Sequence, residues 1–437
     1  SGLFLFLFAG FLLLYSALRR ATMARIVYVI LFSLYFYYKS SGIYFLLLIF
    51  AATSDYWIAK GIHAARSTRA KRWLVVLSVA VNLGMLAYFK YTNFLIDIAN
   101  QMFGQGFMQF QNIFLPVGIS FFLFQSLSYT IDIYRGSLKP VDRWGDYLFY
   151  LSFFPQLVAG PIVRARDFLV QIRQNPIAVS REMFGTGIYL IAIGLFKKAV
   201  ISDYISLNFV DRIFDEPLLY SGFECLAGIY GYALQIYCDF SGYSDMAIGI
   251  ALLLGFRFPK NFDAPYKSAT ITEFWRRWHI SLSSWLRDYL YISLGGNRKG
   301  KLRTYGNLLV TMVLGGLWHG AAIRFILWGT LHGVALALHK LWMAVVPGAK
   351  ATGAQMHWWS RAAGVFFTFN LVCLGWLMFR AESMQTVELM LHQIFSNFNV
   401  PMIPQVIAGY AGVFALIGAG YLLHLMPGSV DRVTQRL

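Results

Sequence analysis

Long apolar runs constrain the fold of this chain more than any other feature. Four of them are almost free of charge: Leu3–Leu18, Trp73–Ile96, Phe121–Tyr134 and Val406–Met426. A helix needs roughly 20 apolar residues to cross a bilayer, and a backbone in lipid must satisfy its own hydrogen bonds. Only 13% of the residues are charged, whereas a soluble domain carries about twice that share. The sequence therefore predicts an all-α polytopic membrane protein.

Eleven stretches are candidates for transmembrane helices, and together they predict a single membrane domain over residues 1–437. No soluble domain, linker or internal repeat interrupts them. The first stretch lacks a charged region before it and a small-residue cleavage pattern after it, so we expect a span and not a signal peptide. The expected spans are 3–18, 26–38, 43–58, 73–96, 113–133, 182–201, 223–240, 306–320, 323–343, 362–379 and 405–425.

The distribution of basic residues predicts an orientation, because Lys and Arg collect in cytoplasmic loops. Residues 97–112 contain no base, and residues 202–222 contain Arg212 among several acidic residues, so we place both loops outside. The N-terminus is then outside and the C-terminus inside, provided that 147–160 and 244–256 are re-entrant or buried pieces. The same rule accounts for the net charge of +17 and argues against nucleic acid as a partner.

The cysteines do not indicate a metal site. Cys225, Cys238 and Cys373 lie in apolar surroundings without the spacing of metal ligands. No glycine-rich dinucleotide-binding fingerprint occurs either. We therefore expect no metal and no bound cofactor.

The segment 272–289 is unusually rich in Trp, Arg and His. As one helix starting near Thr272, it would gather its aromatic residues on one face. Such a helix is typical of a membrane interface, with tryptophans at the headgroups. The opposite face would suit a phosphate- or thioester-bearing donor equally well. That face would carry Arg276, His279, Ser283 and Arg287.

A second segment places His319 inside an apolar run, within Trp318-His319-Gly320. An ionisable side chain at membrane depth is costly and suggests a function, although it can also bond a neighbouring helix. His332 follows thirteen residues later and would point away from His319 on a continuous helix, so we favour a packing role for it. Asp239 could orient a histidine or cap a helix, and we favour the cap.

Eight short fragments occur in order between Tyr88 and Gly320, and their order is more specific than any one of them. They resemble the membrane-bound O-acyltransferase (MBOAT) family, in particular bacterial alginate O-acetylases and the related D-alanyl transferases of teichoic acids. The similarity covers roughly residues 88–333. The fragments are Tyr88–Tyr91, Pro116–Phe121, Ser126–Asp132, Phe154–Ile162, Tyr237–Asp245, Asn261–Tyr266, Phe274–Ser283 and Gly315–Gly320.

The resemblance implies a ring of about eleven helices, with re-entrant and interfacial pieces, around a tunnel that is thin at its centre. It implies that His319 is the central catalytic residue and that His279 is a second catalytic position. A neutral imidazole can take the proton of a sugar hydroxyl during attack on a thioester, so we expect His319 to act as general base. His279 would polarise the carbonyl, orient the acyl group or bind the donor.

Further residues are candidates for substrate or donor binding: Trp318, Arg276, Arg277, Ser283, Arg287 and Asp239. The arginines would hold the phosphates of the donor at the cytoplasmic mouth. An acyl-enzyme on serine is disfavoured because no Gly-x-Ser-x-Gly elbow occurs.

The expected function is transfer of an acetyl group from a cytoplasmic thioester, either acetyl-CoA or an acylated carrier protein, to an exported or cell-wall polysaccharide such as alginate. A periplasmic hydrolase-like partner would receive the acyl group on the outer side of the bacterial inner membrane. Within the same class, the alternative is D-alanyl transfer from a carrier protein to teichoic acid. From another class, the alternatives are a transporter or a scaffold of an export complex.

Overall fold

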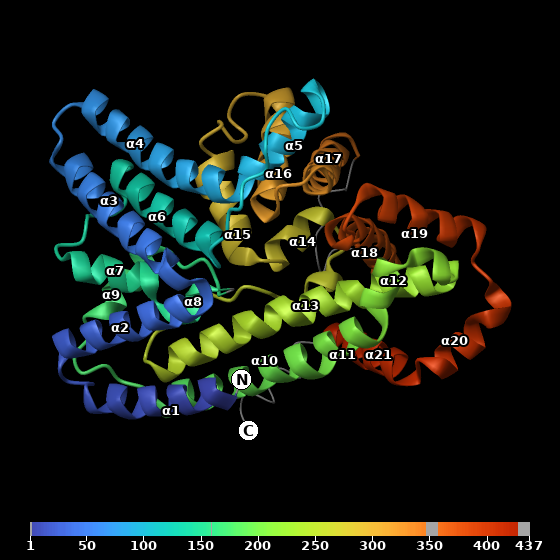
Figure 1. Ribbon diagram of the computed structural model, residues 1–437, viewed down its shortest axis with the longest axis horizontal. Helices are drawn as coiled ribbons and strands as arrows, with labels where there is room; N and C mark the ends of the chain where they lie inside the picture. The colour runs from blue at the N-terminus through green and yellow to red at the C-terminus, as the bar shows by residue number, and fades with distance from the viewer. Residues whose placement is uncertain (1, 159, 347–356, 427–437) are drawn as a thin grey trace. The chain divides into compact units, whose positions relative to one another are not determined.

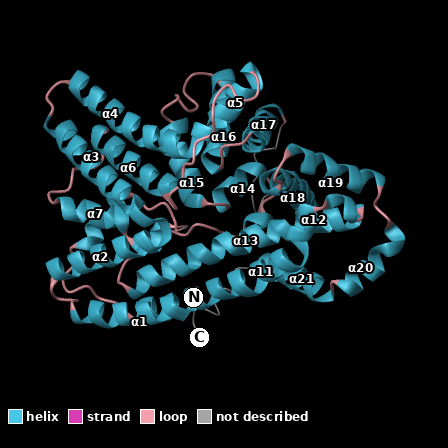
Figure 2. Cartoon of the chain, viewed as in Figure 1, coloured by secondary structure: helices cyan, strands magenta, loops and turns pink. Residues whose placement is uncertain are grey.

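The computed structural model describes residues 2–158, 160–346 and 357–426, and every regular element in these ranges is helical (Figure 2). The described residues form two compact units: residues 1–191 with 247–259, and residues 192–246 with 260–437. The all-α prediction is thereby confirmed for the described part of the chain, whereas the prediction of one membrane domain stays a prediction.

Unit 1 contains the C-terminal end of α13 (Gly222–Leu253) and the following α-helices, the last of them in most of its length, labelled in Figure 1. They are α1 (Gly2–Ala17), α2 (Thr22–Ser41), α3 (Phe45–Ala64), α4 (Thr68–Leu86), α5 (Thr92–Phe103), α6 (Ile119–Tyr134), α7 (Trp144–Ser152), α8 (Phe154–Leu157), α9 (Ala165–Ile172) and α10 (Arg181–Leu195).

Unit 2 contains most of α13 together with helical elements before and after it. The elements are π-helical η3 (Phe196–Ser202), α11 (Asp203–Ile205), α12 (Asp211–Asp215), α13 (Gly222–Leu253), the 3-10 turn η6 (Pro265–Lys267), α14 (Ile271–Arg277), α15 (Ile280–Trp285), π-helical η7 (Leu286–Tyr291), α16 (Lys301–His319), α17 (Ile323–Val345), α18 (Trp358–Arg380), α19 (Met384–Ser396), α20 (Ile403–Gly409) and α21 (Ala411–Leu425).

Four helical stretches in the described ranges are long and apolar enough to cross a membrane, and α20 with α21, bent by 92°, would make a fifth. The stretches are Thr22–Ala64, Thr68–Phe103, Arg181–Asp215 and Trp358–Arg380. Several apolar helices therefore agree with a polytopic membrane protein, while the count of eleven is not reached on these criteria. One reason is that two expected spans, 26–38 and 43–58, fall within a single helical stretch.

One of the two alternatives for residues 244–256 is wrong. They are not a separate re-entrant piece, because α13 continues without a break from Gly222 to Leu253, whereas the alternative of a buried piece that adds no crossing stays a prediction. Gly242 does not interrupt the helix but lets it approach α10 closely: a Cβ at Gly242 would lie 2.7 Å from the Gly194 carbonyl oxygen. Small residues serve the same purpose in many membrane helix pairs. By contrast, the described part of the other proposed non-crossing segment, 147–160, contains two helices that are too short to span, α7 and α8.

Arg25 anchors the N-terminal part of unit 1 without a carboxylate. Its side chain is 1% exposed and donates to the backbone carbonyls of Arg19 at 2.8 Å, Ile172 at 3.1 Å and Gln174 at 2.7 Å. The planar guanidinium suits this task because it presents several donors in a fixed geometry. Arg25 thereby joins the start of α2 to the segment after α9.

Replacing Arg25 should therefore destabilise the protein. Arg25→Met keeps an apolar stem but leaves these carbonyl oxygens without their donor, which we expect to cost on the order of 3 kcal/mol. Thermal unfolding in detergent measures the change. Arg20→Met, at an exposed position nearby, is the matched control and should melt like the parent. Equal melting of the two variants would contradict this role for Arg25.

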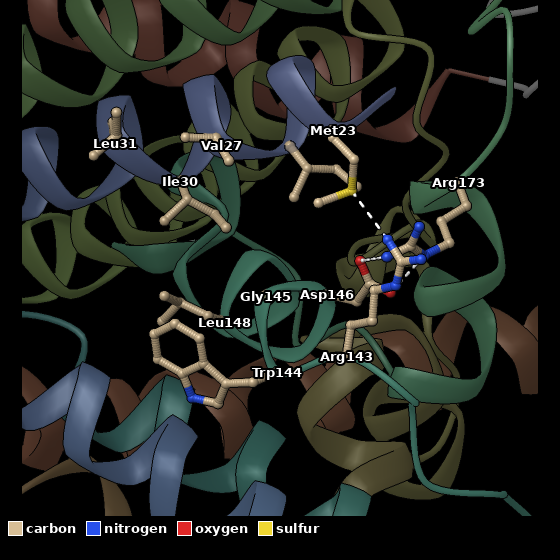
Figure 3. Close-up of a pocket in the computed structure, with 11 residues that line it drawn as sticks. Met23, Val27, Ile30, Leu31, Arg143, Trp144, Gly145, Asp146, Leu148 and Arg173 are labelled. Atoms are coloured by element: carbon tan, nitrogen blue, oxygen red, sulfur yellow. Dashed lines mark hydrogen bonds and ion pairs between the residues drawn. The ribbon is translucent and has the colours of Figure 1, made fainter. Parts of the chain in front are cut away.

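A small pocket in unit 1 has a volume of about 260 Å³ and lies between α2 and α7 (Figure 3). Met23, Val27 and Leu31 line it from α2, and Trp144 lies on the opposite side. At one end Arg173 donates to both carboxylate oxygens of Asp146, at 2.6 and 2.8 Å. This bidentate pair satisfies the charges of Arg173 and Asp146, while Arg143 donates to Met23 Sδ at 3.3 Å. The rest of the pocket lining is mostly apolar.

Candidate active site

The segment around His279 is not one helix, contrary to the expectation for 272–289. Helix α14 ends at Arg277, Trp278 is extended, and His279 adopts a left-handed conformation with φ of 42° before α15 begins at Ile280. The helix also starts earlier than expected: Thr270 is its N-cap and accepts a hydrogen bond from the Glu273 N–H at 3.1 Å. The break removes His279 from the face shared with Arg276 and buries it to 1% exposure.

Asn261 holds this break in place from outside the segment. Its backbone carbonyl accepts from the Ile280 N–H at 2.9 Å. Its side-chain oxygen accepts from Ser281, from the N–H at 3.2 Å and from the hydroxyl at 2.9 Å, while its amide nitrogen donates to Ser244 Oγ at 3.0 Å. These contacts supply the backbone partners that a continuous helix would otherwise provide.

The same contacts define the tautomer of His279. Because the Ser281 N–H can only donate, the Asn261 atom that faces it is the carbonyl oxygen, and this oxygen lies 3.2 Å from His279 Nδ1. An oxygen acceptor requires a donor, so Nδ1 carries the proton and Nε2 carries the lone pair. Burial lowers the pKa of His279 well below its usual range, and the nearby His319 imidazole lowers it further. His279 is therefore neutral near pH 7.

His319 is the last residue of α16 and lies in an aromatic frame. The rings of Trp318, Trp328 and Phe379 meet its imidazole edge-on, with centroid distances of 5.0, 5.1 and 5.2 Å. Trp318 also lies 6.2 Å from His279 by ring centroids, so it stands next to both histidines. Unlike His279, His319 is partly exposed.

The hairpin of α16 and α17 positions His319 by close backbone approach. A Cβ at Gly316 would lie 2.1 Å from the Phe325 carbonyl oxygen, and one at Gly320 would lie 2.0 Å from the Phe325 ring. Only glycine permits these contacts, because any side chain would overlap atoms of Phe325. The glycines around Trp318-His319 thus bring α17 against the end of α16.

His332 lies closer to His319 than a continuous helix would allow. Helix α16 ends at His319 and α17 starts at Ile323, so Trp328 packs between the two histidines, 5.1 Å from His319 and 4.8 Å from His332. His332 is fully buried and accepts a hydrogen bond from Trp275 Nε1 at 3.3 Å. Its place in an aromatic cluster agrees with a packing role.

The expectation that Asp239 caps a helix is wrong, because Asp239 lies within α13. Its carboxylate pairs with Lys198 at 2.5 Å, and Lys198 also pairs with Asp203 at 2.8 Å. Lys197, the neighbouring residue, pairs with Asp245 of α13 at 2.7 Å. Asp239 and Asp245 of α13 are therefore paired with two lysines of the π-helical segment η3, which no sequence motif singled out.

The proposed donor-binding residues are not gathered on one face. Arg277 pairs with Glu273 at 2.9 Å and Arg287 with its neighbour Asp288 at 2.7 Å, whereas Ser283 donates to the Trp278 carbonyl at 3.1 Å. Arg276 is exposed. The structure brings together His279, Trp318 and His319, and adds Asn261, which the sequence pattern marked only as part of the fragment Asn261–Tyr266.

The chain is similar to known proteins over most of its length. The model of the MBOAT, membrane-bound O-acyltransferase family, matches residues 144–385. The chain is 43% identical over 373 residues to a Pseudomonas aeruginosa protein named "Probable alginate O-acetylase AlgI", covering 84% of this chain and 69% of that protein. It is 35% identical over 411 residues to the "Peptidoglycan O-acetyltransferase" of Helicobacter pylori, covering 88% and 76%.

A more distant similarity extends to another acyl group. The "Teichoic acid D-alanyltransferase" of Bacillus subtilis is 29% identical over 287 residues, which cover 62% of this chain and 70% of that protein. Both the family model and the two O-acetylating relatives span the residues that form the histidine pair. The chain therefore belongs to the membrane-bound O-acyltransferase family and is a multi-pass membrane O-acyltransferase.

Proposed function

We propose that this enzyme moves an acetyl group from a cytoplasmic thioester across the bacterial inner membrane for O-acetylation of an exported or cell-wall polysaccharide. The observation that carries the proposal is the pair of imidazoles, His319 partly exposed and His279 buried, that both lie next to Trp318. The similarity to alginate and peptidoglycan O-acetylating proteins supports acetyl as the group transferred.

In the proposed reaction His319 is the general base. Its neutral imidazole takes the proton of the acceptor hydroxyl as that oxygen attacks the thioester carbonyl. The new C–O bond forms, the C–S bond breaks, and the leaving thiolate recovers the proton from the imidazolium. The aromatic frame of His319 limits water, which would otherwise compete with the acceptor hydroxyl.

His279 has a narrower role than the sequence suggested. Its Nδ1 proton points to Asn261, so the remaining nitrogen, Nε2, offers a lone pair and not a donor. A neutral imidazole in this tautomer cannot polarise the thioester carbonyl by hydrogen bonding. We assign His279 to accept a hydrogen bond from a substrate O–H or N–H, and thereby to orient that substrate beside His319.

The binding of the donor and the direction of transfer complete the proposal. The N-terminus faces the outside and the C-terminus faces the cytoplasm. On the cytoplasmic side Arg276 holds the donor phosphates, because Arg277 and Arg287 already pair with carboxylates of the chain. Ser283 and Asp239 contribute to substrate binding to a smaller extent than Arg276. A periplasmic acyltransferase partner or the polysaccharide itself receives the acyl group.

The identity of the donor can be tested directly. Proteoliposomes that contain the purified enzyme should release or transfer radiolabelled acetyl from acetyl-CoA well above empty liposomes. D-alanyl transfer, which the teichoic acid relative makes the alternative, predicts turnover of a D-alanylated carrier protein instead. Turnover of the carrier protein without turnover of acetyl-CoA would overturn the donor assignment while leaving the enzyme class in place.

A further inference from the structure

A second cavity lies in unit 2, and neither His279 nor His319 lines it. It is a groove of about 800 Å³ between α13, α18, α21 and the η6 turn. Its volume falls in the range of sites that enclose a small ligand. Aromatic rings line most of its length, and two basic residues, Lys267 and Arg361, line it as well.

The tyrosines of the groove line it with their rings, because their hydroxyl groups are hydrogen-bonded to other residues of the protein. Tyr421 donates its hydroxyl proton to the Tyr230 carbonyl at 2.7 Å, Tyr230 donates to Asn370 Oδ1 at 2.8 Å, and Tyr266 donates to the Ala233 carbonyl at 2.5 Å. Their polar atoms are thus satisfied within the protein. With Phe366, Phe369 and Ile417 they leave an apolar surface suited to a hydrocarbon chain.

The basic residues of the groove are close together. Arg361 donates to the backbone carbonyl of Lys267 at 3.5 Å, and Lys267 donates its ammonium to the carbonyl of Met426. Glu273 lies 3.8 Å from Arg361 but pairs more closely with Arg277, at 2.9 Å. Arg277 also lies 3.7 Å from Asp263, which pairs with Lys260 at 2.6 Å. The two carboxylates Glu273 and Asp263 therefore serve three cations, and with Lys267 the positive charge is in excess at this point.

We infer that the groove binds an anionic phospholipid of the surrounding membrane. The lipid phosphate lies between Lys267 and Arg361, and one acyl chain follows the aromatic wall toward Ile417. Two cations, Lys267 and Arg361, face one lipid phosphate. Charge complementarity therefore favours a headgroup with net negative charge over a zwitterionic headgroup. Trp358, 81% exposed and also lining the groove, suits the headgroup level of a bilayer, where tryptophan is enriched.

Titration of the purified full chain in detergent with single lipids tests the inference, with binding followed by native mass spectrometry. Phosphatidylglycerol should bind at least about tenfold more tightly than phosphatidylcholine with the same chains, because two basic residues each favour an acidic headgroup. Glycerol phosphate, which has the same anionic group but no chain, should not compete at equal concentration. Equal binding of the two lipids, or competition by glycerol phosphate, would overturn the proposal.

Two variants locate the site. The double variant K267Q/R361Q should lose roughly 10- to 30-fold in affinity for phosphatidylglycerol, and Val365→Trp should weaken it by filling the groove. R298Q/K299Q removes the same charge from exposed positions outside the groove and should bind like the parent. If K267Q/R361Q fails to fold, binding of phosphatidylglycerol by Val365→Trp alone tests the site. Unchanged binding by a folded groove variant places the lipid elsewhere and refutes the site.

Discussion

His319→Ala is expected to lower the rate of acetyl transfer by roughly 10³-fold, because loss of a general base typically costs 10²–10⁴-fold. The substitution removes the group that takes the hydroxyl proton and leaves the aromatic frame of Trp318, Trp328 and Phe379 in place. The measurement is transfer of radiolabelled acetyl in proteoliposomes at matched amounts of inserted protein. The loss should appear in kcat, since the imidazole acts in the transition state.

The control for this experiment is His392→Ala, which removes an exposed histidine of α19 in the same unit. It should transfer acetyl at the parental rate. Thermal unfolding of His319→Ala separates a chemical effect from a folding defect, and we expect its melting temperature to stay near that of the parent. A folded His319→Ala protein that retains more than about a tenth of the parental rate would exclude His319 as the base.

The sequence predicted best those features that depend only on the residues of one local segment. His319 stood out because an imidazole in an apolar run is costly, and the structure places it at the end of α16. Helicity followed from the apolar runs. These features depend on local composition, which a single sequence displays directly.

Other features depend on partners that are distant in sequence, and these could not be predicted. The periodicity of residues 272–289 fits one helix, yet His279 is left-handed because Asn261, eighteen residues earlier, supplies hydrogen bonds to Ile280 and Ser281. A cap was expected at Asp239 because an apolar run there meets a possible re-entrant piece, whereas α13 continues through it and Gly242 contacts Gly194. In both cases a tertiary contact overrides a local preference.

Asn261→Ala is the second substitution for which a large effect is expected. It removes the acceptor for His279 Nδ1 and Ser281 and the donor to Ser244, so the imidazole loses both its orientation and its tautomer. We expect acetyl transfer to fall by roughly 10²-fold, as for groups that must be held in a productive geometry. Unsatisfied buried groups should also destabilise the fold by about 2–4 kcal/mol, measured by thermal unfolding.

Asn261→Asp distinguishes orientation of His279 from simple structural support. The carboxylate still accepts from His279 and Ser281, so more activity should remain than in Asn261→Ala. A negative charge beside an imidazole favours its protonated form and raises its pKa. Protonated His279 cannot accept a hydrogen bond from substrate, so transfer by Asn261→Asp should be low at acid pH and recover as the pH rises through the raised pKa. The parent, whose His279 pKa is lowered by burial, should lack this step. A pH–rate profile of Asn261→Asp that parallels the parental profile would show that Asn261 supports the fold without controlling the protonation of His279.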